Sequence, residues 1–187
     1  MENLAHSTLI SIQKLYAYYK ALGERAMTQV PEAGLFWVPG PEGNSIAVLV
    51  KHLSGNMRSR FTDFLTTDGE KPDRNRDTEF VLDFGTREEM EELWDRGWRV
   101  VEDMFATLSG EDMDRVVYIR NEGHLVVEAL HRQLGHYAYH VGQIVLIART
   151  IVGDEWVSLS IPRGKSEEFF QKKMAQAKRR AHFTDQQ

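Results

Sequence analysis

The chain has 187 residues, of which 42% are hydrophobic and 27% are charged, proportions typical of a soluble globular protein and unlike those of a disordered chain. A formal net charge of −5 argues against nucleic acid as the main partner, and the lack of cysteine excludes disulfides, thiolate metal ligands and cysteine nucleophiles. The sequence shows neither a secretory leader nor an apolar run of membrane-spanning length, so we expect a single cytoplasmic domain over residues 1–187.

Two helices are predicted in the first third of the chain. Apolar residues recur at spacings of three and four from about Leu4 to Met27, which is typical of an amphipathic helix. The prolines and glycines of residues 31–43 then predict a loop without a helix. Asn44 or Ser45 can cap the second helix, which we expect to extend to about residue 66.

A polar loop over residues 67–85 follows, and it is longer than a compact domain usually contains without a purpose. Two roles are open to its arginines, Arg74 and Arg76. They would either close over a site and bind an anionic substrate, or pair with acidic side chains of the loop and fix it in place. Four candidates for that pairing are Asp68, Asp73, Asp77 and Glu79.

A hairpin is predicted between the third and fourth helices. The third helix, about residues 86–108, begins with a capping box at Thr86. Residues 116–126 have the pattern of two short strands around a turn at residues 121–123, although the second strand is equally readable as the first turn of the next helix. That helix, about residues 126–151, is apolar over a wide arc, which predicts a central position.

The C-terminal part is predicted to contain an extended stretch over residues 156–161 and a short helix over residues 166–178. A basic tail from about residue 172 to 187 is more typical of a solvated surface than of a nucleic-acid contact. Four long helices with one long crossover loop predict an all-α four-helix bundle. Its additions would be the long loop between helices 2 and 3, a small hairpin before helix 4 and the short C-terminal helix.

Histidine is the main candidate metal ligand in a chain without cysteine, and two of the seven histidines have a suitable spacing. His136 and His140 are four residues apart, so on a helix their imidazoles project from one face, one turn apart, as two ligands of one ion do. Gln143 shares this face, and Gly142 predicts close helix packing. In a chain with seven histidines the spacing also arises by chance, so packed or surface histidines are the alternative.

A third candidate ligand, His52, lies on the second predicted helix. Asn56 and Arg60 follow it one and two turns later on the same side. Sites in helical bundles are commonly built from facing helices, so His52 is able to meet the pair on the fourth helix. Taken alone, it is more typical of a hydrogen-bonded core histidine. The other histidines have no partner at a useful spacing and are expected to be exposed to solvent: His6, His124, His131 and His182.

Two segments resemble the signature of the DinB/YfiT-like superfamily. They are residues 44–57, which end in KHLSGNM, and residues 136–144, HYAYHVGQI. The loop over residues 68–80 resembles the branch that is catalogued as a domain of unknown function. The resemblance spans the first through the fourth helix and implies a four-helix bundle, often dimeric, with a divalent metal ion at three histidines. By position, these are His52, His136 and His140.

Three neutral imidazoles would leave coordination positions open, as in a catalytic zinc or nickel site. The resemblance implies an enzyme that activates a water or a small-molecule substrate, such as a low-molecular-weight thiol, for hydrolysis or transfer. Asn56 and Arg60 are placed to orient a substrate or stabilise negative charge, and Gln143 to hydrogen-bond a ligating imidazole or a metal-bound water.

Alternatives to this interpretation stay open at the level of the residue and of the protein. Asn56 and Gln143 are equally suited to satisfying buried polar groups. The whole chain would otherwise be a stress protein that binds a metal or small ligand without turnover, or a metal-free structural homodimer whose histidines are packed.

Overall fold

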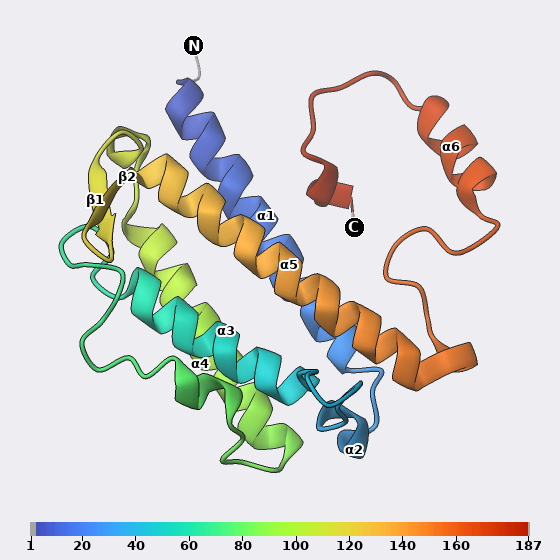
Figure 1. Ribbon diagram of the computed structural model, residues 1–187. Coiled ribbons are helices and arrows are strands. Elements are labelled where there is room, and N and C mark those ends of the chain that lie inside the picture. Colours follow the sequence, from blue (N-terminus) through green and yellow to red (C-terminus); the bar gives the residue numbers. More distant parts are fainter. Residues whose placement is uncertain (1–2, 187) are drawn as a thin grey trace.

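The computed structural model describes residues 3–186 of the chain. Most of these residues are helical, and their only strands form one two-stranded sheet, so the chain has the predicted all-α class (Figure 1). Across the same residues, none of the helices combines the length and apolar character that crossing a bilayer requires. The four long helices are α1 (Leu4–Met27), α3 (Ile46–Phe61), α4 (Arg87–Thr107) and α5 (Val126–Val152).

α3 and α4 begin at the predicted caps, but α3 ends early. The Ser45 hydroxyl accepts a hydrogen bond from the backbone N–H of Val48, and Thr86 begins α4 with a capping box. We expected the second helix to reach about residue 66. It ends at Phe61 because the next residue is extended and Asp63 adopts a left-handed backbone conformation with φ of 49°, which cannot continue a right-handed helix.

A short helix, α2 (Glu32–Leu35), interrupts the stretch predicted to be free of helix. Pro31 precedes it as the cap, where a missing N–H costs nothing because the first turn of a helix leaves its N–H groups unpaired. Gly34 is required by space, since a Cβ there would lie 2.8 Å from Val30 and 2.9 Å from Ile151. Prolines and glycines exclude a long helix here but not a single turn.

The hairpin is confirmed, with its turn displaced. β1 (Val116–Ile119) pairs antiparallel with β2 (Glu122–Leu125), so the second arm is a strand. The turn lies at Arg120 and Asn121, whose φ values are 58° and 62°, instead of at residues 121–123. The carboxylate of Asp68 accepts hydrogen bonds from the backbone N–H groups of both turn residues, at 2.9 and 2.8 Å, and so stabilises this conformation.

The four long helices pack as two pairs, and the two pairs pack against each other. α3 lies against α4, α1 lies against α5, and the pairs meet where α3 contacts α5 (Figure 1). Gly97 allows α4 to approach α3 closely, since a Cβ there would lie 2.9 Å from the Cα of Ser54. Between the helices, the buried ring of Tyr16 packs edge-on against Phe105 and Tyr137. The α3–α5 contact determines where the site described below is placed.

The long loop is fixed to the body at several points. The hydroxyl of Ser59 on α3 donates a hydrogen bond to the carbonyl of Gly69 at 2.8 Å, and the N–H of Gly69 donates to the carbonyl of Tyr118 in β1. Arg74 forms ion pairs with Glu79 and Glu70, so of its two predicted roles the structure shows the one that fixes the loop.

Near the C-terminus, α6 (Ser166–Met174) ends before the predicted residue 178, and none of its residues is buried. Figure 1 shows it apart from the four long helices. The chain then returns to α1, where Nε2 of His182 lies 3.2 Å from the hydroxyl of Ser11, so His182 is not simply solvated as expected. Four short 3-10 helices complete the described elements: η1 (Asp77–Phe80), η2 (Gly110–Asp112), η3 (Gly153–Glu155) and η4 (Phe183–Gln186).

Candidate metal centre

His52, His136 and His140 lie together where α3 contacts α5. The Nε2 atom of His136 is 3.2 Å from that of His52 and 3.1 Å from that of His140. Two nitrogens bound at 2.0–2.1 Å to one tetrahedral zinc ion lie about 3.3–3.4 Å apart. The two Nε2 separations are close to that value, so these three residues form a group that could hold a metal ion.

Hydrogen bonds on the far side of two rings determine which nitrogen faces the centre. Nδ1 of His52 donates to Oε2 of Glu79 at 2.8 Å, because an ionised carboxylate only accepts. Nδ1 of His140 donates to Oε1 of Gln143 at 2.7 Å, which is the contact predicted for Gln143. In both rings a proton is therefore on Nδ1, and Nε2 is the nitrogen that faces His136.

This arrangement suits a cation better than it suits a proton. When neutral, His136 has one N–H to offer, and a proton on its Nε2 can serve only one of the two lone pairs that face it. Its Nδ1 is buried and has no hydrogen-bond partner within residues 3–186. A metal ion between the three nitrogens would accept all three lone pairs, so the donor set fits a divalent ion that binds imidazole.

Electrostatics keep two of the rings in the form that binds metal. Burial, together with the neighbouring rings of His140 and His52, lowers the pKa of His136 to about 3. Burial also lowers the pKa of His140, with a further contribution from His52 and partial opposition from the hydrogen bond to Gln143. Both imidazoles are consequently neutral at pH 7, and metal binding there does not have to displace a proton from them.

The charge on Glu79 is stabilised in the same region. Burial alone would raise the pKa of this carboxyl, but hydrogen bonds from His52 and Arg74 outweigh that effect and hold the pKa below its usual value. Glu79 is therefore ionised at pH 7, as its role as the acceptor for His52 requires.

The site is enclosed on the α3 side and open on the α5 side. The side chain of His52 is buried, and the ring of Phe80 stacks on it at a centroid distance of 4.8 Å. His136 and His140 are only half-buried. The two histidines of α5 therefore keep a solvent exposure that His52 lacks.

Two of the predicted substrate-orienting residues do not contact the imidazoles. Oδ1 of Asn56 accepts hydrogen bonds from Gln133 at 2.6 Å and from Tyr137 at 3.2 Å, so Asn56 satisfies buried polar groups, which was its alternative role. Arg60 is buried and donates to the carbonyl of Gly69 and to Glu70. Gly142, expected in close helix packing, is exposed, with open space where a Cβ would lie.

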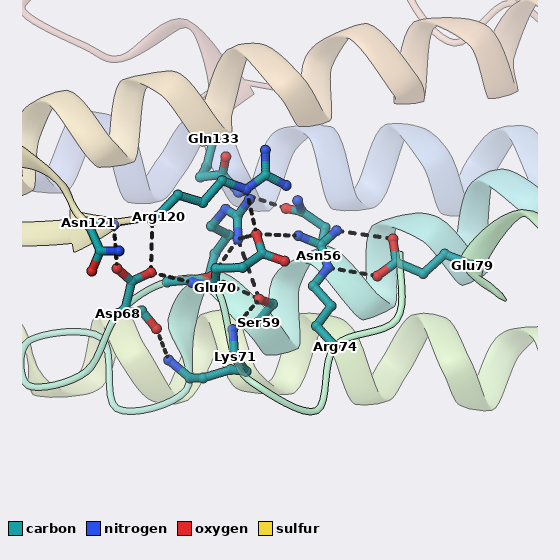
Figure 2. Close-up of polar contacts among 12 residues, drawn as sticks. Asn56, Ser59, Asp68, Glu70, Lys71, Arg74, Glu79, Arg120, Asn121 and Gln133 are labelled. Atoms are coloured by element: carbon teal, nitrogen blue, oxygen red, sulfur yellow. Dashed lines mark hydrogen bonds and ion pairs between the residues drawn. The ribbon is translucent and has the colours of Figure 1, made fainter. Parts of the chain in front are cut away.

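Three arginines, one from α3, one from the long loop and one from the hairpin turn, converge on one carboxylate beside this site. Oε2 of Glu70 lies 3.0 Å from Arg60, 3.0 Å from Arg120 and 3.4 Å from Arg74, and Figure 2 shows Arg74 linking this group to Glu79. The charges of Arg60 and Arg74 also contribute to the lowered pKa of His136. Their positive charge therefore acts on His136.

Glu79 is the part of the site that the sequence analysis did not connect to the histidines. It was named only as a pairing candidate for Arg74, and it stands 27 positions after His52 in a loop, a separation that carries no periodic signal. An acidic residue able to ion-pair inside an unusually long loop was the only available indication.

Comparisons with known proteins give a family but no characterised relative. Neither the comparison with curated proteins nor that with solved structures found a match. The sequence model of a family described as "Protein of unknown function (DUF1572)" matches residues 3–165, a range that includes all three histidines and Glu79 and stops before α6. The chain therefore belongs to this family of unknown function.

Proposed function

We propose that this chain is a divalent-metal-dependent enzyme of the DinB/YfiT-like type, a four-helix bundle in which His52, His136 and His140 hold zinc or nickel. The observation that carries the proposal is the convergence of three Nε2 atoms with separations of 3.1 and 3.2 Å. The hydrogen bonds that place the protons of two rings on Nδ1 support it.

The ligand number favours catalysis over a structural role. Structural zinc sites are usually closed by four protein ligands, whereas catalytic sites have three and leave a position for water or substrate. When bound, such an ion supplies a water of lowered pKa or holds a thiol as thiolate. We propose a small-molecule substrate, such as a low-molecular-weight thiol, and transfer or hydrolysis as the reaction.

Residues of the chain would contribute orientation and charge. Gln143 holds the ring of His140, and Glu79 holds that of His52. Arg60 does not touch the imidazoles, but its charge acts on His136, and we propose that it stabilises negative charge developing at the centre. We assign Asn56 a structural role because both of its contacts are to buried neighbours.

We also propose a homodimer, by analogy with the DinB/YfiT-like type. The outward face of α5 supports it. Tyr139 and Leu146 are 63% and 66% exposed. Gly142 between them and Gly135 one turn before Tyr139 have open space where a Cβ would lie. A monomeric mass in sedimentation equilibrium would exclude this assembly.

Metal content measured by plasma mass spectrometry tests the proposed site. We expect about one zinc or nickel ion per chain in the wild type and none in His52→Ala, His136→Ala or His140→Ala. His131→Ala is the matched control, because His131 lies on the same helix but is exposed and bonds to the carbonyl of Val127. Equal metal content in all variants would contradict the assignment.

Turnover then separates an enzyme from a protein that only binds metal. The loaded wild type, the His140→Ala variant and the His131→Ala control are assayed for transfer of low-molecular-weight thiols to electrophiles and for hydrolysis of small esters and amides. Activity confined to wild type and control supports the enzyme. Stoichiometric metal without turnover on any of these substrates favours the non-catalytic alternative.

A further inference from the structure

The Glu79 carboxylate connects a proposed metal ligand to a buried arginine. Its Oε2 accepts hydrogen bonds from Nδ1 of His52 at 2.8 Å and from Arg74 at 3.0 Å, and its Oε1 accepts a second bond from Arg74 at 2.8 Å. The side chains of all three residues are 8% exposed or less. Figure 2 shows Arg74 and Glu79 facing each other through this two-bond contact.

Gly55 provides the room for this carboxylate. It follows His52 by three positions on α3, so the two residues are neighbours on one face of the helix. A Cβ at Gly55 would lie 2.6 Å from Oε1 and 2.9 Å from Cδ of Glu79. Glycine in the middle of a helix costs about 1 kcal/mol relative to alanine, and here the missing side chain is what admits Glu79.

The rest of the loop keeps Glu79 in place. Arg74 also contacts Glu70, the N–H of Lys71 donates to the hydroxyl of Ser59, and η1, which contains Glu79, contacts α3. A buried side chain with this number of fixed neighbours has little rotational freedom. The long loop therefore supplies one preorganised acceptor to the α3 side of the histidine group.

We propose that Glu79 is a positioning residue of the metal centre: its carboxylate fixes His52 in the Nδ1–H tautomer so that Nε2 faces the ion, with Arg74 orienting the carboxylate and Gly55 admitting it. The inference rests on the proposed function for its metal, but the tautomer of His52 is a property of the metal-free chain as well. Outer hydrogen bonds of this kind typically change metal affinity 10–100-fold when they are removed.

The substitution Glu79→Gln tests the charge without changing the shape. With the amide oxygen at the Oε1 position, the NH2 group faces Nδ1 of His52 and donates to it, which moves the proton of the ring to Nε2. With the oxygen at the Oε2 position, the NH2 group instead faces the Nε–H of Arg74, donor against donor. In the first orientation the NH2 group also faces the Nη2–H of Arg74 at the Oε2 position, so either orientation sets one N–H of Arg74 against a donor. The amide therefore cannot reproduce all three hydrogen bonds of the carboxylate, and it no longer holds His52 exclusively in the Nδ1–H form.

Two measurements are made on the same proteins. Zinc affinity is determined by competition with a chromophoric chelator, and the tautomer of His52 is determined from the 15N chemical shifts of its ring in metal-free protein. We expect Glu79→Gln to bind zinc 10–100-fold more weakly and to populate the Nε2–H form of His52 beside the Nδ1–H form, whereas the wild type shows the Nδ1–H form alone.

Asp73→Asn is the matched control. It removes an equal charge from the same loop, but Asp73 is exposed and forms its ion pair with Arg58 on the surface of α3. We expect it to retain the wild-type tautomer and zinc affinity within about threefold. Gly55→Ala is a second variant that displaces Glu79 without removing its charge, and it should weaken zinc binding in the same direction.

The outcomes distinguish this inference from the proposed function. A wild-type tautomer and wild-type zinc affinity in both Glu79→Gln and Gly55→Ala would overturn the positioning role even if the protein binds metal. A wild type that binds no zinc would refute the proposed metal site, while a tautomer change in metal-free Glu79→Gln would still support the contact between Glu79 and His52. If Glu79→Gln does not fold by circular dichroism, Gly55→Ala decides.

Discussion

His136 carries the least satisfied polar atom of the candidate centre. Its Nδ1 is buried without a hydrogen-bond partner in the described part of the chain, residues 3–186, whereas the corresponding atoms of His52 and His140 have acceptors. Burying an unpaired polar group costs about 1–3 kcal/mol. A ring that only packed would gain nothing to offset this cost. A ring that binds an ion through Nε2 would offset it with the free energy of that bond.

The lowered pKa values make the stability of the metal-free protein depend on pH. In the folded chain His136 titrates at about 3 and His140 below its ordinary value of 6.5, whereas in the unfolded chain both titrate near 6.5. As pH falls from about 6.5 to 5, the unfolded chain binds protons that the folded chain does not. The free energy of unfolding should therefore decrease with falling pH, by at most about 1.4 kcal/mol per pH unit for each group.

Urea unfolding in the presence of a chelator, at about pH 7, 6 and 5, measures this dependence. The range lies above the pH at which Glu79 and other carboxyls of the unfolded chain take up protons. His136→Asn removes one of the two titrations and should reduce the slope. A slope that is the same in variant and wild type would show that His136 is not held neutral by the fold.

At this scale the sequence predicts what depends on local geometry. The spacing of His136 and His140, and the reach of Gln143 to His140, follow from the repeat of one helix. Glu79 and Gly55 could not be assigned, because the contact between them is made by a loop folding back on α3, and nothing in either segment specifies that approach. The role of Asn56 depended in the same way on its partners on α5.

At the scale of the helices, capping residues and apolar periodicity predict most boundaries but not all of them. α1 was predictable from its apolar spacing, α4 from apolar spacing together with its capping box, and α5 needed only its apolar arc. The end of α3 and the single turn α2 were missed because each depends on one or two residues: a left-handed Asp63 in the first case and a proline cap in the second. The hairpin turn was displaced because Asp68 from another element stabilises it.

The contact between α3 and α4 should be sensitive to a single methyl group. Gly97→Ala places a Cβ 2.9 Å from the Cα of Ser54 and 3.1 Å from the sulfur of Met57, and backbone cannot move aside as a flexible side chain can. We expect a loss of about 1–3 kcal/mol in the free energy of unfolding, measured by urea denaturation.

Arg96→Ala is the control for Gly97→Ala. Arg96 precedes Gly97, is exposed, and donates a hydrogen bond to the carbonyl of Glu92 in its own helix. We expect a change within about 0.5 kcal/mol in the free energy of unfolding. If Gly97→Ala proved equally neutral, the close α3–α4 approach would not be a feature of the protein in solution.

Across the whole molecule, the metal should stabilise the fold by mass action. A ligand present at 100 times its dissociation constant adds about 2.7 kcal/mol to the free energy of unfolding, which in a chain of this size raises Tm by about 5–11 °C. We expect zinc to raise Tm of the wild type and of His131→Ala, and a chelator to reverse the rise. An equal rise in His140→Ala would show that zinc acts elsewhere on the chain.

The position of the histidines between two helix pairs has a mechanical consequence. The backbones of α1 and α5, and those of α3 and α4, run close together, whereas α3 and α5 approach each other at fewer positions. His52 stands on α3, and His136 and His140 stand on α5. An ion bound to all three would cross-link α3 to α5, and its loss would leave the shared hydrophobic core to hold the two pairs together.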